Sequence, residues 1–364
     1  MFNFSKFSTR SFDWLLLVVV ILLMSIGLAA VYSIDLSRGL TLVYFKKQAI
    51  AGGIGLVLLF LASTFQYNFY RSYAKLFYLA SVILLIGVLV FGSTIRGTRG
   101  WFAFAGFSFQ PVEVAKVAII LILAYIISSF GRRFERPLFF FGTGMVALLM
   151  IGLIMLQPDL GSAMIIGLIW FALMLLVKAR RAYIIGLIVV VAVVSVLGWF
   201  FFLKDYQKSR VMTFIDPASD PLGAGYNVTQ AVIAIGAGQW FGRGLGFGSQ
   251  SQLRFLPEAQ TDFVFSVIGE ELGFAGALVT LFLFGILFWR LLRIIRQTDD
   301  DFVSAAVSGM LVLFVGQLFV NVGANLGLLP ITGITLPFVS YGGSSLMINL
   351  LLIGVAESMV VRRY

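Results

Sequence analysis

Residues 14–34 read WLLLVVVILLMSIGLAAVYSI, a stretch without a charged side chain. A helix needs about 20 apolar residues to cross the ~30 Å hydrocarbon core of a bilayer. Lys6 and Arg10 precede the stretch as in a signal peptide, but the apolar run is long enough for a helix that spans the membrane and is retained. We therefore predict a first transmembrane helix here.

The rest of the chain repeats this pattern. It is 60% hydrophobic and 12% charged, against about 25% charged residues in soluble domains. Further long apolar runs lie at 48–64, 76–91, 112–129, 138–156, 160–177, 182–203, 263–289 and 302–356, of which only 112–129 and 263–289 contain charged residues. The last is too long for one helix, and Asn321, Asn325, Gly327, Pro330 and Pro337 should divide it into two spans. We expect an all-α polytopic membrane protein of about ten helices.

The charges predict how this bundle is oriented. With an even number of helices both termini share one side, whose loops hold 15 of the 26 basic residues against six acids. The opposite side holds the other 11 basic residues and ten of the 16 acids, so the positive-inside rule predicts cytoplasmic termini. Residues 204–261 then form a long extracytoplasmic loop between the seventh and eighth helices. The net charge of +10 therefore indicates contact with membrane lipid rather than binding to nucleic acid.

No repeat or linker divides the chain, so one membrane domain over residues 1–364 is expected. Cysteine and histidine are absent, which excludes disulfides, thiol nucleophiles, imidazole bases and His/Cys zinc sites. Acid–base chemistry must therefore fall to Asp, Glu, Lys or Tyr.

Charges at membrane depth suggest function by default. Glu113 and Lys116, in QPVEVAK, share one helix face and form either a structural ion pair or part of a site. Arg99 and Trp101 lie on a basic, aromatic approach that alternatively contacts lipid headgroups. Asp159, in QPDLGSA, could equally cap the helix that follows it.

The long loop contains a glycine-rich run, GQWFGRGLGFG, at residues 238–248. Such backbone can cradle phosphate, but the strand and helix context of a nucleotide fingerprint is missing. Arg210, Arg243 and Arg254 surround the loop and would suit an anionic ligand, with a purely solvated loop as the alternative.

Asp262 follows this loop in FLPEAQTDF, where the polar segment meets an apolar run. Desolvation favours its neutral form and nearby arginines its charged form, so the carboxylate could be tuned as a general base. The alternative is an N-cap for the eighth helix.

The run NVGANLGLLPITGITLPFVSYGGSS at residues 321–345 resembles the signature of the SEDS family, the shape, elongation, division and sporulation proteins. QPVEVAK, QPDLGSA, DPLGAGYN and FLPEAQTDF resemble further blocks of that family in the expected order, so the resemblance covers essentially the whole chain. Val112 departs from it, since the family commonly has Ser before the Glu of its first block. The short termini and DPASDPLGAGYN look more like the RodA branch than the FtsW branch.

The resemblance implies a peptidoglycan glycosyltransferase of the bacterial cytoplasmic membrane that polymerises lipid II for cell elongation and rod shape. It implies undecaprenyl-pyrophosphate-linked glycan as donor, a class B penicillin-binding protein and other elongation-complex proteins as partners, and Asp262 as the catalytic aspartate. Arg99, Lys116, Arg210, Arg243 and Arg254 are the candidates for binding substrate, and a divalent cation such as Mg²⁺ or Mn²⁺ would assist. The candidate supporting residues are Trp101, Gln110, Glu113, Asp159, Glu258 and Ser340.

Two other classes of protein fit the same features. A lipid II flippase would also need many helices with intramembrane charges, although transporters usually carry inverted repeats. A scaffold that only recruits a class B penicillin-binding protein would need no chemistry at Asp262.

Overall fold

The computed structural model describes residues 12–37, 39, 42–95, 97–104, 107–131, 133–197, 200, 212, 216 and 223–360. The helices are α1 (Trp14–Leu36), α2 (Val43–Thr64), α3 (Tyr67–Phe91), α4 (Pro111–Ser129), α5 (Pro137–Met155), α6 (Leu160–Leu176), α7 (Arg181–Leu197), α9 (Ala224–Ala237), α10 (Ser249–Gln252), α11 (Val264–Gln297), α12 (Asp301–Asn325) and α13 (Gly343–Val360). The strands are β1 (Ser93–Ile95), β2 (Thr98–Phe104) and β3 (Phe107–Phe109), paired antiparallel in that order.

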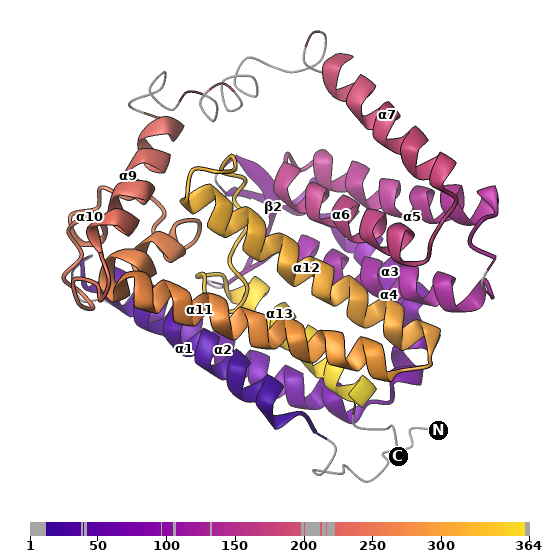
Figure 1. Cartoon of the computed structure of the whole chain (residues 1–364), viewed down its shortest axis with the longest axis horizontal. Helices are drawn as coiled ribbons and strands as arrows, with labels where there is room; N and C mark the ends of the chain where they lie inside the picture. Colours follow the sequence, from indigo (N-terminus) through magenta and orange to yellow (C-terminus); the bar gives the residue numbers. More distant parts are fainter. Residues whose placement is uncertain are drawn as a thin grey trace.

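Within these described residues, eight helices are long and apolar enough to cross a membrane, and two shorter apolar helices lie at Leu160–Leu176 and Arg181–Val193. The expected all-α polytopic architecture is confirmed. Figure 1 shows the long helices side by side, with α9 and α10 gathered beyond one end of α11.

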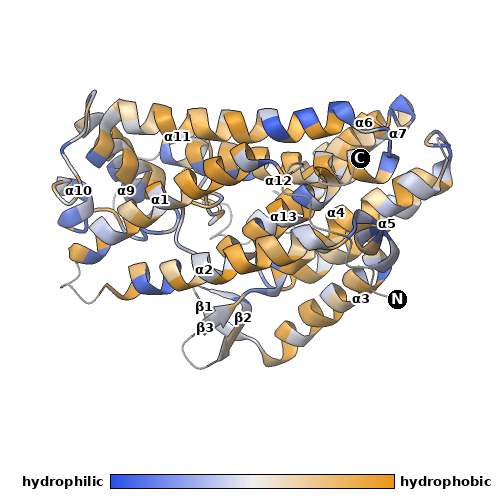
Figure 2. Ribbon diagram, turned by 90° about the horizontal axis from the view of Figure 1, so that it is seen from below, coloured by the Kyte–Doolittle hydropathy of each residue, from blue (hydrophilic) through white to orange (hydrophobic). Residues whose placement is uncertain are grey.

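The outward faces of the helices are apolar as well as the inward ones. On α1, Leu16 and Leu23 are fully buried while Leu15 and Leu22 stay exposed. A helix facing water would carry polar residues there, so the medium around the bundle is lipid. Figure 2 shows hydrophobic colour along most of each long helix, with hydrophilic residues concentrated near helix ends.

The centre of the bundle is formed by α4, α12 and α13, most of whose residues are buried. Small residues allow close approach there: a Cβ on Gly354 of α13 would overlap the carbonyl oxygen of Leu59 on α2. Such packing substitutes for a hydrophobic driving force, which lipid does not supply between helices.

The two ends of the bundle differ. At one end, here called the termini end, α1 begins and α13 ends, and Asp13 pairs with Arg290 of α11 while its N–H donates to Glu357 (3.0 Å). At the other, here called the loop end, α4 and α13 begin and α12 ends, and Gln110 N donates to Ser344 Oγ (3.3 Å). Asp262 and the other described site candidates lie at the loop end.

Several sequence-based boundaries were wrong. The helices α2, α3 and α11 extend beyond the apolar runs into segments that carry Lys46, Arg71 and Arg290, because long basic side chains can extend from a helix toward the membrane surface. Asn321 does not interrupt its helix, since α12 continues to Asn325. The three-stranded sheet and α9 were not predicted, because short elements in polar loops leave little periodic signal.

Candidate active site

Asp262 lies at the end of the segment that joins α10 to α11. The carbonyl of Glu258, at φ 54°, accepts the N–H groups of Thr261 (3.0 Å) and Asp262 (3.2 Å), which closes a turn. Gln260 and Thr261 are buried and Asp262 is half-buried. Phe263 occupies the N-cap position of α11, so Asp262 stands just outside the helix rather than at the predicted cap position.

The helix that follows Asp262 is in two parts. Gly273 breaks α11 with φ 69° and ψ −168°, a conformation open essentially only to glycine. Every residue from Val264 to Glu271 is buried, so this short first part is enclosed by protein on all sides. The sequence predicted one uninterrupted span here.

The glycine-rich run bridges this break. Four backbone hydrogen bonds connect the two segments: Arg243 N to Glu270 O (3.0 Å), Gly244 N to Glu271 O (3.0 Å), Phe274 N to Gln239 O (2.7 Å) and Ala275 N to Trp240 O (3.0 Å). They satisfy backbone groups that the broken helix leaves open. Two N–H groups of the suggested phosphate cradle are thereby occupied, and the run serves as part of the framework of α11.

Two adjacent buried acids of α11, Glu270 and Glu271, bind the short helix α10, which follows the glycine-rich run. Glu270 Oε1 accepts Gln250 N (2.7 Å) and Glu270 Oε2 accepts Ser251 N (3.0 Å). Glu271 Oε1 accepts the hydroxyls of Ser33 (2.6 Å) and Ser251 (2.9 Å), which ties α10 to α1. The segment leading to Asp262 is therefore anchored where it starts.

Residues of the 321–345 signature anchor the same segment where it ends. Tyr341 N donates to Gln260 O (2.8 Å), and Ser340 Oγ donates to Thr261 O (2.6 Å). The carbonyl of Asp262 accepts amide N–H groups from two asparagines of α12, which are described below. Three consecutive peptide carbonyls before α11 are thus held by one region of the chain.

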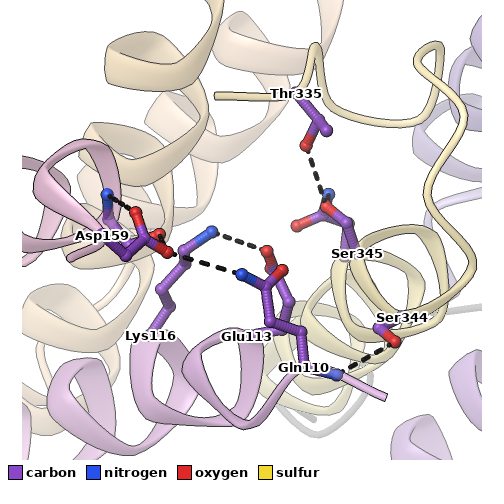
Figure 3. A network of polar contacts seen from close by, with 9 residues as sticks. Gln110, Glu113, Lys116, Asp159, Thr335, Ser344 and Ser345 are labelled. Carbon is purple, nitrogen blue, oxygen red and sulfur yellow. Dashed lines mark hydrogen bonds and ion pairs between the residues drawn. The ribbon is translucent and has the colours of Figure 1, made fainter. Parts of the chain in front are cut away.

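A second polar cluster surrounds the start of α4, as Figure 3 shows. Lys116 Nζ lies 2.8 Å from Glu113 Oε1, and both side chains are buried. Gln110 Nε2 donates to Asp159 Oδ2 at 3.4 Å. Asp159 also accepts the N–H and the hydroxyl of Ser162, each at 2.9 Å, as the N-cap of α6.

The geometry therefore confirms the helix-cap alternative for Asp159 and the ion pair for Glu113 and Lys116. Glu113 Oε2 is buried and has no hydrogen-bond partner among the described residues.

The signature segment connects the two clusters. Ser340 contacts the peptide beside Asp262, Thr335 hydrogen-bonds Ser345 (3.2 Å), and Ser344 accepts from Gln110. In Figure 3, Thr335, Ser344 and Ser345 face the side of the cluster that holds Gln110 and Glu113. The backbone around Asp262 and the cluster that holds the buried Lys116 are thus both contacted by the signature segment at the loop end.

The described arginine candidates have backbone partners at helix C-termini. Arg99 donates to Val90 O (2.9 Å) and Gly92 O (3.2 Å) after α3. Arg243 Nε donates to Ala237 O (3.2 Å) at the end of α9, and Arg254 donates to Ser37 O (2.9 Å) after α1. Cations there complement the helix dipole.

A guanidinium has five N–H donors, so some remain for an anion, and substrate binding by these arginines stays a prediction. Arg210 lies outside the described residues.

The remaining candidates have structural contacts. Trp101 is half-buried on β2, where its carbonyl accepts Ser93 Oγ (3.0 Å), and Glu258 Oε2 accepts Gln260 Nε2 (3.1 Å). Among the described residues no group of three or more Asp or Glu could hold a metal ion, and the Mg²⁺ or Mn²⁺ suggested above stays a prediction.

Residues 13–364 match the family model of FtsW, RodA and SpoVE, described as a cell cycle protein. The chain belongs to the SEDS family. This SEDS protein is 36% identical to the probable peptidoglycan glycosyltransferase FtsW of Thiomicrospira cyclica, over 98% of this chain and 93% of that one. It is 38% identical to peptidoglycan glycosyltransferase MrdB of Escherichia coli K12, over 85% of this chain and 84% of that one. Stage V sporulation protein E of Bacillus subtilis is 36% identical, with 94% and 95% covered.

Solved structures match the SEDS protein over its length. A chain of a peptidoglycan synthase complex that coordinates polymerisation and crosslinking has a TM-score of 0.83 at 33% identity, with 97% of this chain and 99% of that chain covered. The rod shape determining protein RodA of Thermus thermophilus has a TM-score of 0.74 at 29% identity, with 98% and 99% covered. Identities of 36 to 38% to relatives of different names leave the branch within the family undecided.

Proposed function

We propose that this chain is a peptidoglycan glycosyltransferase that polymerises lipid II into β-1,4 glycan strands. The observation that carries the proposal is Asp262, a half-buried carboxylate whose backbone is fixed at the loop end of a membrane bundle. The proposal is supported by relatives that are named peptidoglycan glycosyltransferases and that match this chain over most of their length.

The reaction is an inverting displacement. The 4-hydroxyl oxygen of N-acetylglucosamine in lipid II bonds to C1 of the muramic sugar at the end of the donor glycan. The bond from C1 to the undecaprenyl pyrophosphate breaks, and the hydroxyl proton passes to Asp262. Because the pyrophosphate is alpha and the product beta, one step and one base suffice, with no covalent enzyme intermediate.

The leaving pyrophosphate needs positive charge directed at it. Lys116 is a buried cation at the loop end, and Arg99, Arg210, Arg243 and Arg254 are the further candidates. A divalent cation would add to this charge. The polyprenyl chains lie against the apolar outer faces of the helices, which explains why the polymerase is embedded in a membrane.

The loop end faces the outside of the bacterial cytoplasmic membrane in this proposal, and both termini are cytoplasmic. Basic residues lie within about one turn of helix ends at the termini end, as the positive-inside rule requires of a cytoplasmic surface: Arg71, Arg136, Arg181 and Arg293. A class B penicillin-binding protein is the proposed partner for crosslinking, supported by the synthase complex to which the chain is similar. Elongation and rod shape, with other elongation-complex proteins, are the proposed cellular setting.

The decisive test is Asp262→Asn in a lipid II polymerisation assay with the partner protein present. Loss of the base should lower the rate by about 10²- to 10⁴-fold. Asp299→Asn is the matched control, because Asp299 is an exposed carboxylate at the other end of the bundle. Wild-type polymerisation by folded Asp262→Asn would refute the general-base role.

The alternatives of a flippase and a scaffold predict different results. Vesicles with lipid II in one leaflet would reveal a flippase by movement between leaflets without polymer. A scaffold would give unchanged polymer in the Asp262→Asn variant. Adding a chelator to the wild-type assay tests the divalent cation.

A further inference from the structure

The first turn of α11 is capped by a side chain from another helix. Near a helix start the N–H groups lack intrahelical partners, and the N-cap side chain usually accepts one of them. Phe263 occupies the N-cap here and has no oxygen to offer. Instead Asn325 Oδ1, from the end of α12, accepts Ser266 N (3.0 Å) and Ser266 Oγ (2.7 Å).

The same amide also holds the peptide of Asp262. Asn325 Nδ2 donates to the carbonyl of Asp262 at 2.8 Å. Asn321, one turn earlier on α12, donates to that carbonyl at 3.2 Å and to Ile334 O at 2.9 Å. Both asparagines are buried, Asn325 fully and Asn321 with 3% exposure. The amide of Asn325 therefore connects the peptide before α11 to the first turn of the helix.

These contacts fix the backbone of Asp262 without engaging its carboxylate. The asparagine bonds go to the main-chain oxygen, and Ser340 holds the preceding carbonyl of Thr261. A catalytic group must keep its geometry to within about 1 Å, since larger misplacement can cost ~10²-fold in rate. The asparagines supply this constraint from a rigid helix rather than from the loop itself.

We propose that Asn325, supported by Asn321, is a positioning residue that sets the location of the Asp262 carboxylate for proton transfer. The inference rests on the proposed function of Asp262 as the general base. It assigns a role in turnover to the side-chain amides of Asn321 and Asn325. From the sequence, these two residues were predicted only to interrupt a helix.

The test is Asn325→Asp, which is nearly isosteric. An aspartate keeps an oxygen for Ser266 but replaces the amide donor with an oxygen facing the Asp262 carbonyl. We expect kcat for lipid II polymerisation to fall ~10- to 100-fold while KM changes less than threefold. Asn321→Ala removes the longer of the two bonds to the Asp262 carbonyl, together with the bond to Ile334 O, and should lower kcat less.

A structural role is distinguished by two comparisons. Thr143→Val removes a buried hydroxyl of α5 that hydrogen-bonds Phe139 O and Trp170, so it controls for lost stability away from the site. It should lower the unfolding temperature while kcat stays at the wild-type value. In an Asp262→Asn background, Asn325→Asp should have little further effect on kcat, because a residue that acts through Asp262 has nothing left to position.

The outcomes separate the two proposals. If Asp262→Asn leaves the rate unchanged, the base assignment fails and the positioning role fails with it. If Asp262→Asn abolishes polymerisation but folded Asn325→Asp retains wild-type kcat, only the positioning role is overturned. If Asn325→Asp does not fold, wild-type kcat in Asn321→Ala would overturn the positioning role. If Asn325→Asp folds and lowers kcat by the same factor in the wild-type and the Asp262→Asn backgrounds, the two residues act independently and the positioning role is also overturned.

Discussion

The break in α11 gives a sharp prediction for stability. Gly273→Ala places a methyl group where φ is 69° and ψ is −168°, a region that costs about 1–3 kcal/mol for a residue with a Cβ. The new Cβ would also overlap the backbone N of Gly242 and lie 2.7 Å from the backbone of Phe241. Backbone cannot rotate away as a flexible side chain can, so the glycine-rich loop must move.

The magnitude follows from the bonds at risk. Displacing the loop breaks at least two of the four backbone hydrogen bonds that bridge the break, each worth about 1 kcal/mol. With about 1 kcal/mol of backbone strain, the free energy of unfolding should fall by at least ~3 kcal/mol.

Unfolding by denaturing detergent in mixed micelles, followed by tryptophan fluorescence, measures this loss. Gly285→Ala is the matched control: it lies in the same helix, and a Cβ there meets nothing within 4 Å. Since alanine favours helices by up to ~1 kcal/mol over glycine, the control should be neutral or more stable. Equal stability of the two variants would refute the account of the break, because the same substitution would then cost the same with and without the bridging loop.

Two further substitutions test the packing elsewhere. Arg290→Met leaves the buried carboxylate of Asp13 without its cation and should lower the free energy of unfolding by about 3 kcal/mol. Adding Asp13→Asn should recover most of this stability, and no recovery would mean that the ion pair is not the cause. Gly354→Val should separate α13 from α2 at Leu59 and destabilise the protein by several kcal/mol. Gly53→Val, where a Cβ meets nothing within 4 Å, should be tolerated. Comparable melting temperatures of the two variants would contradict the close packing.

Hydropathy alone predicted the bundle because crossing a bilayer requires long apolar helices whatever their partners. The runs at 112–129 and 138–156 correspond closely to Pro111–Ser129 and Pro137–Met155. Boundaries were missed where helices continue past the apolar core, as α3 does through Arg71 and Lys75.

The site was predicted only in part. Glu113 and Lys116 were found because a charge inside an apolar run is costly and therefore conspicuous, and Asp262 because it lies where a polar loop meets such a run. Asn321 and Asn325 gave a weaker signal: an amide in such a run indicates a partner but does not identify it. Nor could spacing reveal that Asn325 contacts Asp262, since 63 residues separate them.

The break at Gly273 could not be predicted either. Glycine is common in membrane helices, and nothing local distinguishes Gly273 from Gly285. What differs is the segment packed against each one, and that depends on the whole fold.

The enclosed first part of α11 has a consequence for biosynthesis. Every residue from Val264 to Glu271 is buried, and the partners of its two acids, Ser33, Gln250 and Ser251, precede it in the chain. The contacts around its first turn come later in translation: Asn325 is 59 residues beyond Ser266, and Ser340 is 79 residues beyond Thr261, which precedes the helix. The proposed reaction centre is thus completed only when the two C-terminal helices have been inserted, so we expect a chain that stops after α11 to be membrane-bound but inactive.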